Sequence, residues 1–439
     1  MIYRARVVVT MDGPPIENGA VAISDNRIFD VGRFKEVKAR YRKSIDDLPP
    51  GSSPSRASRL RRAAPAGSVV DLGEQALLPG LINAHCHLDY TCLRGKIPPQ
   101  KSFTEWIRAI NAAKARLSEE DYVASIKEGF AEAKRFGTTT IANLEAFPEL
   151  IAKIDEPIRT WWFAELIDVR SPERANEIVD LAIESLKSKK NWGLAPHALF
   201  TASQDLFRYC EEVAPRENIL LTTHLAESRE EMSMFRSGSG PLYEFMKSIG
   251  REMSDCSHGT PLERFVGRLT SAPLSAGSGR ALPQKWIIAH LNELSESDFD
   301  LLARSTKKFH VVHSPRSHSY FAHSPFPFEK LSALGFNICL GTDSLASNEN
   351  FSLFAEMRAF QRNEPGVSPV EIFEMITVNA ALALNQSRHG ATLGRIRPGF
   401  HADLTSIPCS RLRNLFEEIV AFDQPVPWLM ANGAGAEGR

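Results

Sequence analysis

The chain has 439 residues, and its 52 basic and 53 acidic side chains leave a formal charge of −1. This balance, without a long block of one sign, excludes a nucleic-acid arm and a basic membrane patch, and no apolar run approaches the roughly 20 residues of a membrane helix. The six cysteines are scattered without a CxxC pair, and the opening MIYRARVVVT lacks the apolar core of a signal peptide. We therefore expect a reduced, cytoplasmic globular protein with one large domain and a lesser one.

The first part of the chain has the pattern of short strands separated by turns. Strand-like residues at 6–9 and 20–23 flank a turn built on the sequence Asp-Gly-Pro-Pro. Residues 44–68 are rich in Pro, Ser, Gly and Arg, which predicts a flexible insertion in a surface loop. We expect residues 1–79 and 391–439 to join as the two parts of one small β-sandwich domain.

Between residues 80 and 390, apolar strand-like runs alternate with segments of helical period. The runs that fit strands are 81–87, 138–143, 160–166, 192–197, 218–224, 286–290, 309–313 and 337–343. Eight strands, each followed by helical sequence, predict a (β/α)8 TIM barrel. Residues 236–283, which contain Ser/Gly-rich stretches, are expected to form a long excursion between the fifth and sixth strands.

The first predicted barrel strand carries a His-x-His sequence at its end. Side chains alternate along a strand, so His85 and His87 should face one side and Cys86 the other, where it would pack in the core. Two imidazoles on one face at the end of a buried strand form half of a metal site. A hydrogen-bonded histidine pair in a turn would give the same local sequence, so the rest of the chain decides between them.

Histidines collect at the other predicted strand ends as well, where barrels of this kind carry their chemistry. Six of the twelve histidines end predicted strands, namely His85, His87, His197, His224, His290 and His313, and the eighth strand ends at Asp343. This concentration favours a metal site over a set of unrelated surface histidines.

Five segments in this order resemble the motifs of the amidohydrolase superfamily, in its deaminase and chlorohydrolase branch. They are PGLINAHCH at 79–87, TTHLAE at 222–227, AHL at 289–291, HSP at 313–315 and GTDSLASN at 341–348. The resemblance covers nearly the whole chain apart from the Pro/Ser/Gly-rich insertions. It implies a metal-dependent hydrolase on a barrel with a flanking β domain.

The resemblance implies that His85, His87, His224 and Asp343 hold the metal ion. Three neutral imidazoles and one carboxylate suit Zn²⁺, with Fe²⁺ as the alternative, and leave a coordination position for water. The pKa of that water would fall toward about 7. One divalent ion is expected, because two-metal relatives carry a lysine at the end of the fourth strand, which here reads Ala195-Pro196-His197.

Glu227, His290 and Asp343 are the expected catalytic residues. Glu227 follows His224 by three residues, where its carboxyl group could protonate a ring nitrogen while water attacks the adjacent carbon. Asp343 could take the proton of that water, and the resemblance implies that His290 polarises or orients it. A helix N-terminal carboxylate, favoured by the helix dipole, is the alternative interpretation of Glu227.

Trp106 in the segment SFTEW and His197 stand where nucleoside deaminases resemble this chain, so we expect both to contact the substrate. His313 is either a further substrate contact or a histidine hydrogen-bonded to the barrel rim. Relatives commonly have a small residue and an asparagine where this chain has Arg316 and His318. Arg316 would suit a carboxylate on the substrate because its planar fork can donate two charged hydrogen bonds; pairing with a nearby acid is the alternative.

Together these residues predict a hydrolase that releases ammonia from an amino-substituted nitrogen heterocycle. An adenine nucleoside derivative with an acidic 5′ extension is the expected substrate. Adenosine-type members carry a glutamate for the ribose hydroxyls near the end of the SFTEW helix, where this chain reads Ala113-Lys114-Ala115-Arg116. This departure puts an ordinary ribose contact in question.

A chlorohydrolase, or an aminohydrolase of guanine or triazine rings, would use the same site. A non-catalytic metal-binding scaffold would close its coordination shell and would need no acid such as Glu227. Zinc deaminases with a Pro-Cys-x-x-Cys signature are excluded, because only Pro408-Cys409 occurs here. The expected partner is a small-molecule substrate rather than a nucleic acid or a membrane, and a homodimer is compatible with the sequence.

Overall fold

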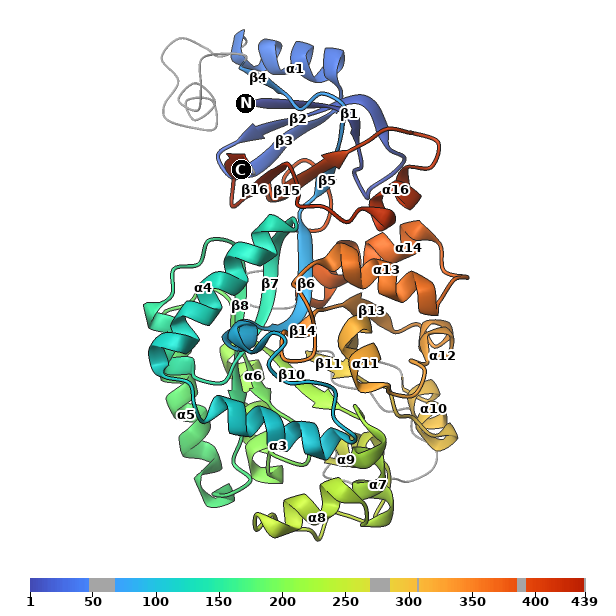
Figure 1. Cartoon of the computed structure of the whole chain (residues 1–439). Coiled ribbons are helices and arrows are strands. Elements are labelled where there is room, and N and C mark those ends of the chain that lie inside the picture. Colours follow the sequence, from blue (N-terminus) through green and yellow to red (C-terminus); the bar gives the residue numbers. More distant parts are fainter. Residues whose placement is uncertain (47–67, 269–284, 306–307, 385–391, 438–439) are drawn as a thin grey trace.

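The protein is described by a computed structural model with two sheets, one above the other in Figure 1. The described residues are 1–46, 68–268, 285–305, 308–384 and 392–437. None of the helices in these ranges combines the length and apolarity that crossing a membrane requires.

The larger sheet has nine strands in the order β13-β12-β11-β10-β9-β8-β7-β6-β14, each parallel to its neighbours. Their bounds are β6 (Leu81–His87), β7 (Thr138–Glu145), β8 (Arg159–Leu166), β9 (Trp192–Pro196), β10 (Leu220–Leu225), β11 (Trp286–His290), β12 (His310–His313), β13 (Asn337–Leu340) and β14 (Asp343–Ser344). All eight predicted runs are therefore strands, and the eighth is split into β13 and β14.

The split strand closes the sheet on itself. The Gly341 amide donates to the His313 carbonyl oxygen at 3.0 Å, and the Thr342 amide donates to the His85 carbonyl oxygen at 3.0 Å. A Cβ atom on Gly341 would lie 2.6 Å from the His85 carbonyl oxygen, so only glycine fits this crossing. The two ends of the strand order meet here, and the sheet curls into the barrel-like form that the sequence predicts.

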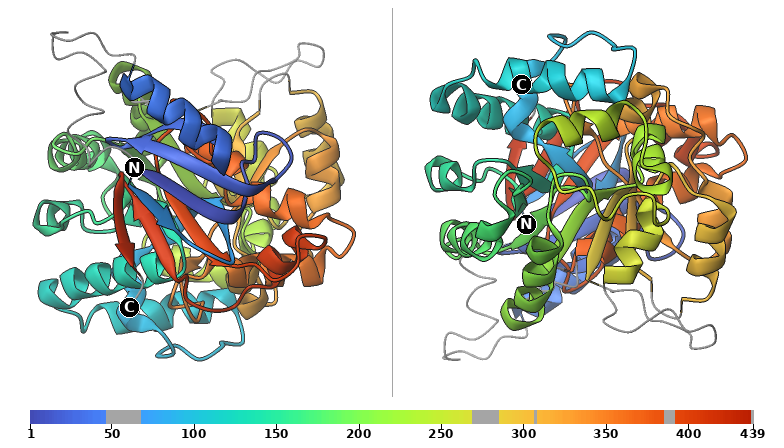
Figure 2. Two further views of the ribbon diagram at one scale, coloured as in Figure 1. Left: turned by 90° about the horizontal axis from the view of Figure 1, so that it is seen from above. Right: turned by 90° about the horizontal axis from the view of Figure 1, so that it is seen from below.

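Helices surround these strands when the molecule is viewed along its long axis (Figure 2). They are α3 (Phe103–Lys114), α4 (Glu119–Arg135), α5 (Ala175–Leu186), α6 (Gln204–Glu217), α7 (Arg229–Ser237), α8 (Pro241–Ser248), α9 (Pro261–Arg268), α10 (Glu296–Ala303), α11 (Pro315–Phe321), α12 (Phe328–Ala333), α13 (Leu353–Asn363), α14 (Pro369–Met375) and α15 (Val378–Leu384). Short 3-10 helices occupy η1 (Leu88–Leu93), η2 (Pro148–Lys153) and η3 (Pro172–Arg174).

The boundaries of these helices follow local sequence signals. The predicted capping box of Ser295 and Asp298 is present at the start of α10, and the same motif starts α4. Gly137 follows α4 with φ of +85°, the left-handed conformation expected of a glycine after a helix. Within the predicted excursion at 236–283, α8 and α9 are helical, and residues 269–284 lie outside the described residues.

The smaller sheet is built from both ends of the chain, as the sequence predicts. Its order is β17-β16-β15-β5-β1-β2-β3, with β4 paired to β1. The bounds are β1 (Ile2–Val8), β2 (Ile16–Ser24), β3 (Arg27–Arg33), β4 (Val69–Asp71), β5 (Gln75–Pro79), β15 (Leu404–Pro408), β16 (Trp428–Ala431) and β17 (Ala434–Glu437), and α16 (Leu415–Ala421) joins β15 to β16. The described strands form one mixed sheet, and a division into the two layers of a β-sandwich stays a prediction.

The sequence prediction missed one helix, α1 (Phe34–Asp46), next to this sheet. Val37 and Tyr41 pack with the buried face of β2 and with Ile2, so the helix covers one side of the sheet. Residues 44–46 are therefore helical and not part of a flexible insertion. The rest of that predicted insertion, 47–67, lies outside the described residues.

The two sheets are joined by the chain and by a buried ion pair. Strand β5 leads through Gly80 directly into β6, and the barrel strands then run away from the smaller sheet (Figure 1). Arg159 on β8 donates to Asp403, next to β15, at 3.0 Å, and both side chains are almost fully buried. The C-terminal ends of the barrel strands consequently lie at the opposite end of the molecule, near α3 and α8.

Candidate active site

The C-terminal strand ends bring together six of the predicted side chains. Three histidines, His85, His87 and His224, form one buried group of potential metal ligands. Glu227, His290 and Asp343 form a second buried group beside it. Strands β6, β10, β11 and β14 supply five of these residues, and the loop after β10 supplies Glu227.

The ligand atoms of the predicted metal set converge on a space the size of an ion. His87 Nε2 and His224 Nε2 are 3.4 Å apart, and Asp343 Oδ1 lies 3.8 Å from the Nε2 atoms of both His85 and His87. A tetrahedral zinc ion with bonds of roughly 2.0–2.1 Å would separate its ligands by about 3.4 Å. Both ring nitrogens of His85 are buried, and neither has a hydrogen-bond partner among the described residues. The residues present therefore fit a divalent cation.

Neighbouring groups orient these ligands. His224 Nδ1 lies 3.0 Å from the His197 carbonyl oxygen, which can only accept, so Nδ1 carries the proton and Nε2 is left with its lone pair. Ser317 Oγ donates to Asp343 Oδ2 at 2.6 Å, and the Ser344 amide donates to Oδ1 at 2.7 Å. The Asp343 carboxylate is thus fixed with Oδ1 toward the histidines.

The electrostatics of the cluster suit a cation. Burial lowers the pKa of His85 and, together with the surrounding histidines, lowers the pKa of His224 well below its usual value. Burial raises the pKa of Asp343, but the adjacent histidines outweigh it and hold that pKa well below the usual range. Neutral imidazoles at His85 and His224 and an ionised carboxylate at Asp343 are protonation states that bind a metal, whereas at His87 the effect of burial, which lowers the pKa, is outweighed by Glu165, which raises it.

Glu227 lies in the loop between β10 and α7 and is buried. Its Oε1 is 3.7 Å from His290 Nε2, and burial, with a contribution from Asp343, raises its pKa well above the usual value. Helix α7 is capped by Ser228, so Glu227 precedes the helix and does not cap it. The raised pKa favours the protonated carboxyl group, which is the form that a general acid requires.

The backbone at three positions in or next to the site adopts a left-handed conformation that residues other than glycine rarely take. Ala226, His290 and Asp343 have φ of 51°, 74° and 57°. Backbone strain of this kind persists where the surrounding structure enforces it, and it is found at functional sites. Here it turns the chain sharply at the ends of β10, β11 and β13.

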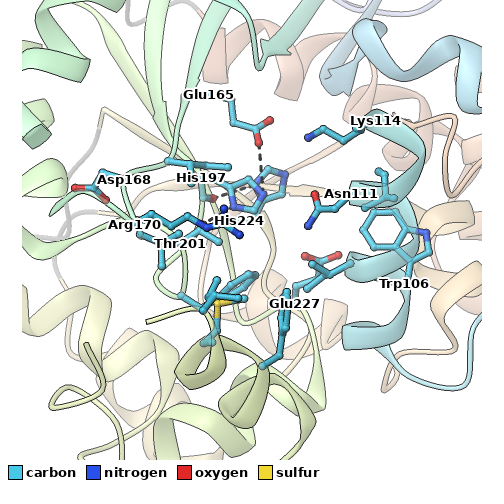
Figure 3. Close-up of a pocket in the computed structure, with 18 of the residues that line it drawn as sticks. Trp106, Asn111, Lys114, Glu165, Asp168, Arg170, His197, Thr201, His224 and Glu227 are labelled. Atoms are coloured by element: carbon cyan, nitrogen blue, oxygen red, sulfur yellow. Dashed lines mark hydrogen bonds and ion pairs between the residues drawn. The ribbon is translucent and has the colours of Figure 1, made fainter. Parts of the chain in front are cut away.

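A cavity of about 590 Å³ opens over the cluster and is largely apolar in its outer part. Figure 3 shows Trp106 and Asn111 projecting from α3 on one side, with Arg170 and Thr201 facing them from the other. His197, Lys114 and Glu165 also line it, as do Phe103, Ile110, Phe200, Phe245 and Met246. Its volume and aromatic walls suit a planar heterocycle carrying a further substituent.

The structure places the predicted substrate contacts in two different regions. Trp106 and His197 line the cavity, whereas Arg316, His313 and His318 do not. Arg316 donates to Glu349 at 2.7 Å and to Asn350 at 2.9 Å, the arrangement that the acid-pairing alternative describes.

His313 and His318 lie along a second cavity of about 450 Å³. The ring of His313 stacks on Phe326 with centroids 4.0 Å apart, and His318 Nδ1 is 3.2 Å from Asn292 Oδ1. Neither histidine reaches the cavity over the metal cluster.

Four polar residues that line the main cavity were not among the predicted site residues. Glu165 is the penultimate residue of strand β8, so the same strand-end argument that selected the histidines could have found it. Lys114 and Asn111 lie on α3, in the region where the expected ribose-binding glutamate is missing. Arg170 lies in the loop after β8, where the sequence carries no periodic signal.

Comparison with known proteins places the chain among hydrolases. Residues 76–426 match the model described as Amidohydrolase family. The 5-methylthioadenosine/S-adenosylhomocysteine deaminase of Pyrococcus furiosus is 28% identical over 85% of this chain and 83% of its own length. The 5′-deoxyadenosine deaminase of Methanothermobacter thermautotrophicus is 27% identical over 91% of this chain and 83% of its own length.

Solved structures share the fold. The Helicobacter pylori aminofutalosine deaminase in complex with methylthio-coformycin superposes with a TM-score of 0.81 at 18% identity, covering 99% of each chain. An adenosine deaminase from Xanthomonas campestris with bound zinc gives a TM-score of 0.74 at 22% identity, covering 99% of this chain and 92% of its own. At these identities the likeness shows the fold alone.

Proposed function

This chain belongs to the amidohydrolase family, and on that premise we propose that it deaminates an adenine nucleoside derivative by hydrolysis and releases ammonia. The observation that carries the proposal is the buried Glu227, whose pKa is raised, beside His290 and the proposed metal-binding cluster, at the base of a cavity sized for a substituted heterocycle. Curated relatives that span most of this chain are deaminases of methylthioadenosine, S-adenosylhomocysteine and 5′-deoxyadenosine, which supports the same substrate class.

We assign the cation to His85, His87, His224 and Asp343, with one Zn²⁺ per chain and Fe²⁺ as the alternative. A cation bound there supplies the Lewis acidity that makes a water molecule nucleophilic at neutral pH. The spacing of the four ligand atoms and the buried nitrogens of His85 support this assignment.

The protein side chains then move the protons. Glu227 gives its proton to the ring nitrogen next to the amino-bearing carbon, which makes that carbon electrophilic. Asp343 accepts the proton of the attacking water, oriented by His290, and returns it to the amino group as the carbon–nitrogen bond breaks. The water oxygen stays on the ring carbon as a carbonyl, its remaining proton returns to Glu227, and the amino nitrogen leaves as ammonia.

Trp106 and His197 are the proposed contacts of the substrate ring, since both line the cavity next to Glu227 and His224. For an acidic 5′ extension we propose Arg170 as the partner, because it lines the same cavity while Arg316 is engaged with Glu349. Asn111 and Lys114 stand where an ordinary ribose-binding glutamate is missing.

The alternative of a chlorohydrolase or of a guanine or triazine aminohydrolase uses the same cluster. Structures of a triazine hydrolase and of the E. coli guanine deaminase share the fold at 16% identity. An identity this low supports a shared fold but not a shared substrate. We further propose a cytoplasmic location, supported by six cysteines that are all free in the structure. For the domains, we propose a (β/α)8 barrel at residues 80–390 and a β-sandwich formed by residues 1–79 and 391–439.

A substrate panel tests the proposal. Purified protein loaded with Zn²⁺ is incubated with adenosine, methylthioadenosine, S-adenosylhomocysteine, aminodeoxyfutalosine, guanine, melamine and a chlorinated triazine, and ammonia and chloride are measured. Ammonia should appear with the adenine nucleosides, fastest with those that carry an acidic extension. Chloride from the triazine without ammonia from any nucleoside would establish the alternative instead.

A further inference from the structure

Glu165 is a cavity carboxylate outside the proposed metal ligands and catalytic residues, and it faces two histidines at once. Its Oε2 lies 3.3 Å from His87 Nδ1, and its Oε1 lies 3.6 Å from His197 Nε2. The Glu165 side chain is only 5% exposed and that of His87 only 6%. Figure 3 shows this carboxylate pointing from β8 toward the histidines, with His197 and Lys114 on its two sides.

The contact with His87 involves the nitrogen that the metal cluster does not use. His87 turns Nε2 toward His224 and Asp343 and Nδ1 toward Glu165. Among the described residues, neither His87 Nδ1 nor Glu165 Oε2 makes a hydrogen bond, so their 3.3 Å approach is a close polar contact between two otherwise unpartnered atoms. A carboxylate that accepts the second ring N–H of a metal-binding histidine fixes the tautomer and ring orientation and raises the basicity of the ligand nitrogen.

The contact with His197 reaches a second part of the cluster. His197 Nδ1 is 2.6 Å from Thr201 Oγ1, so the imidazole is held at one nitrogen by Thr201 and faces Glu165 with the other. The carbonyl oxygen of the same residue accepts the Nδ1–H of His224. Glu165 therefore touches one metal ligand directly and stands beside the residue that orients another.

We propose that Glu165 is a positioning residue that holds His87 toward the metal with one oxygen and His197 toward the substrate with the other. This inference rests on the metal site of the proposed function. It makes retention of the metal and binding of the substrate depend on the same carboxylate, although Glu165 takes no part in the proton transfers.

Glu145 offers a matched control on the neighbouring strand. It is the last residue of β7, whereas Glu165 is the penultimate residue of β8, and it is fully buried. Its oxygens accept from the Phe147 amide at 3.2 Å and from Asn143 Nδ2 at 3.4 Å, both local groups. Glu145→Gln therefore changes a buried carboxyl group on the neighbouring strand without touching His87 or His197.

The experiment compares metal release from the zinc-loaded parent, Glu165→Gln and Glu145→Gln. Zinc transfer to a colorimetric chelator gives the release rate, and thermal melting of the metal-free proteins reports folding independently. Glu165→Gln should bind zinc about 10- to 100-fold more weakly, with an unchanged melting temperature of the metal-free form and, at saturating zinc, a raised KM. Glu145→Gln should release zinc at the parent rate.

Equal weakening in both variants would overturn the proposal, because the loss of any buried carboxyl group in this part of the barrel would then explain it. Parent-like zinc retention in Glu165→Gln would overturn it as well. If Glu165→Gln does not fold, Glu165→Asp decides: it keeps the charge but withdraws the carboxylate, so zinc must still be released faster than from the parent. A parent that binds no zinc would refute the proposed metal site itself, and that result is distinct from a failure of Glu165 alone.

Discussion

Replacing Glu227 by glutamine tests the role of the general acid without removing a proposed metal ligand. The amide fills the same buried space, but it has no proton to give to the ring nitrogen, and Glu227 is outside the proposed ligand set of three histidines and Asp343. A positioned general acid contributes about 10²–10⁴ in rate, which corresponds to roughly 3–5.5 kcal/mol of transition-state stabilisation. The variant should therefore retain its zinc and its melting temperature while kcat falls by that factor.

The dependence of activity on pH should show which protonation state of Glu227 is the active one. Burial raises the pKa of Glu227 well above its usual value, so the carboxyl group is protonated and active below the raised pKa. Activity should fall as the pH rises through that pKa, and the glutamine variant should lack this alkaline limb. The assay is ammonia release across pH, with zinc content measured on the same samples. Activity within a few-fold of the parent, or an unchanged alkaline limb, would show that the acid is another residue.

Three further substitutions test other parts of the molecule. Arg170→Met should lower kcat/KM by about 10-fold for a nucleoside with an acidic extension, the low end expected of a charged hydrogen bond from an exposed side chain. The same variant should leave kcat/KM for neutral 5′-deoxyadenosine unaffected, and equal losses on both substrates would contradict the assignment of Arg170. Arg159→Met leaves the Asp403 carboxylate buried and unpaired, and chemical denaturation should show a loss of about 3–5 kcal/mol. Glu231→Ala leaves two buried backbone amides in the Glu227 loop without their acceptor and should lower the free energy of unfolding by about 2–6 kcal/mol. For either Arg159→Met or Glu231→Ala, a loss of less than about 1 kcal/mol in chemical denaturation would contradict the contacts described.

The barrel and the positions of its histidines could be predicted because both follow from short-range patterns. Apolar runs gave the strands, and the alternation of side chains placed His85 and His87 on one face and Cys86 in the core, where it is fully buried. The rule that chemistry lies at the strand ends then selected residues far apart in the sequence. The structure brings five of these side chains, together with Glu227 from the loop after β10, into the two adjoining groups of the cluster.

Other features depend on information that is not local. Arg316 follows His313 closely in the sequence, but Pro315 starts α11 and its helix turns the guanidinium toward Glu349 and Asn350. Arg170 reaches the cavity from a loop whose path no periodicity encodes. The left-handed backbone at His290 and Asp343 arises from tertiary packing, since the sequence has no glycine there.

Helix α1 was missed for a different reason. Phe34, Val37 and Tyr41 have the spacing of one helix face, but their period was obscured by the strands before them and the Pro/Ser-rich stretch after them. The helical signal was present and was outweighed by its surroundings.

The most direct test of the central claim is mass spectrometry of the nucleoside after turnover in ¹⁸O-labelled water. The zinc-loaded protein should convert S-adenosylhomocysteine or 5′-deoxyadenosine into a product whose ring has lost its amino group and gained a single labelled oxygen, with an equal amount of ammonia released. An unchanged nucleoside, or a product that keeps its amino group and carries no label in the ring, would contradict hydrolytic deamination at this site.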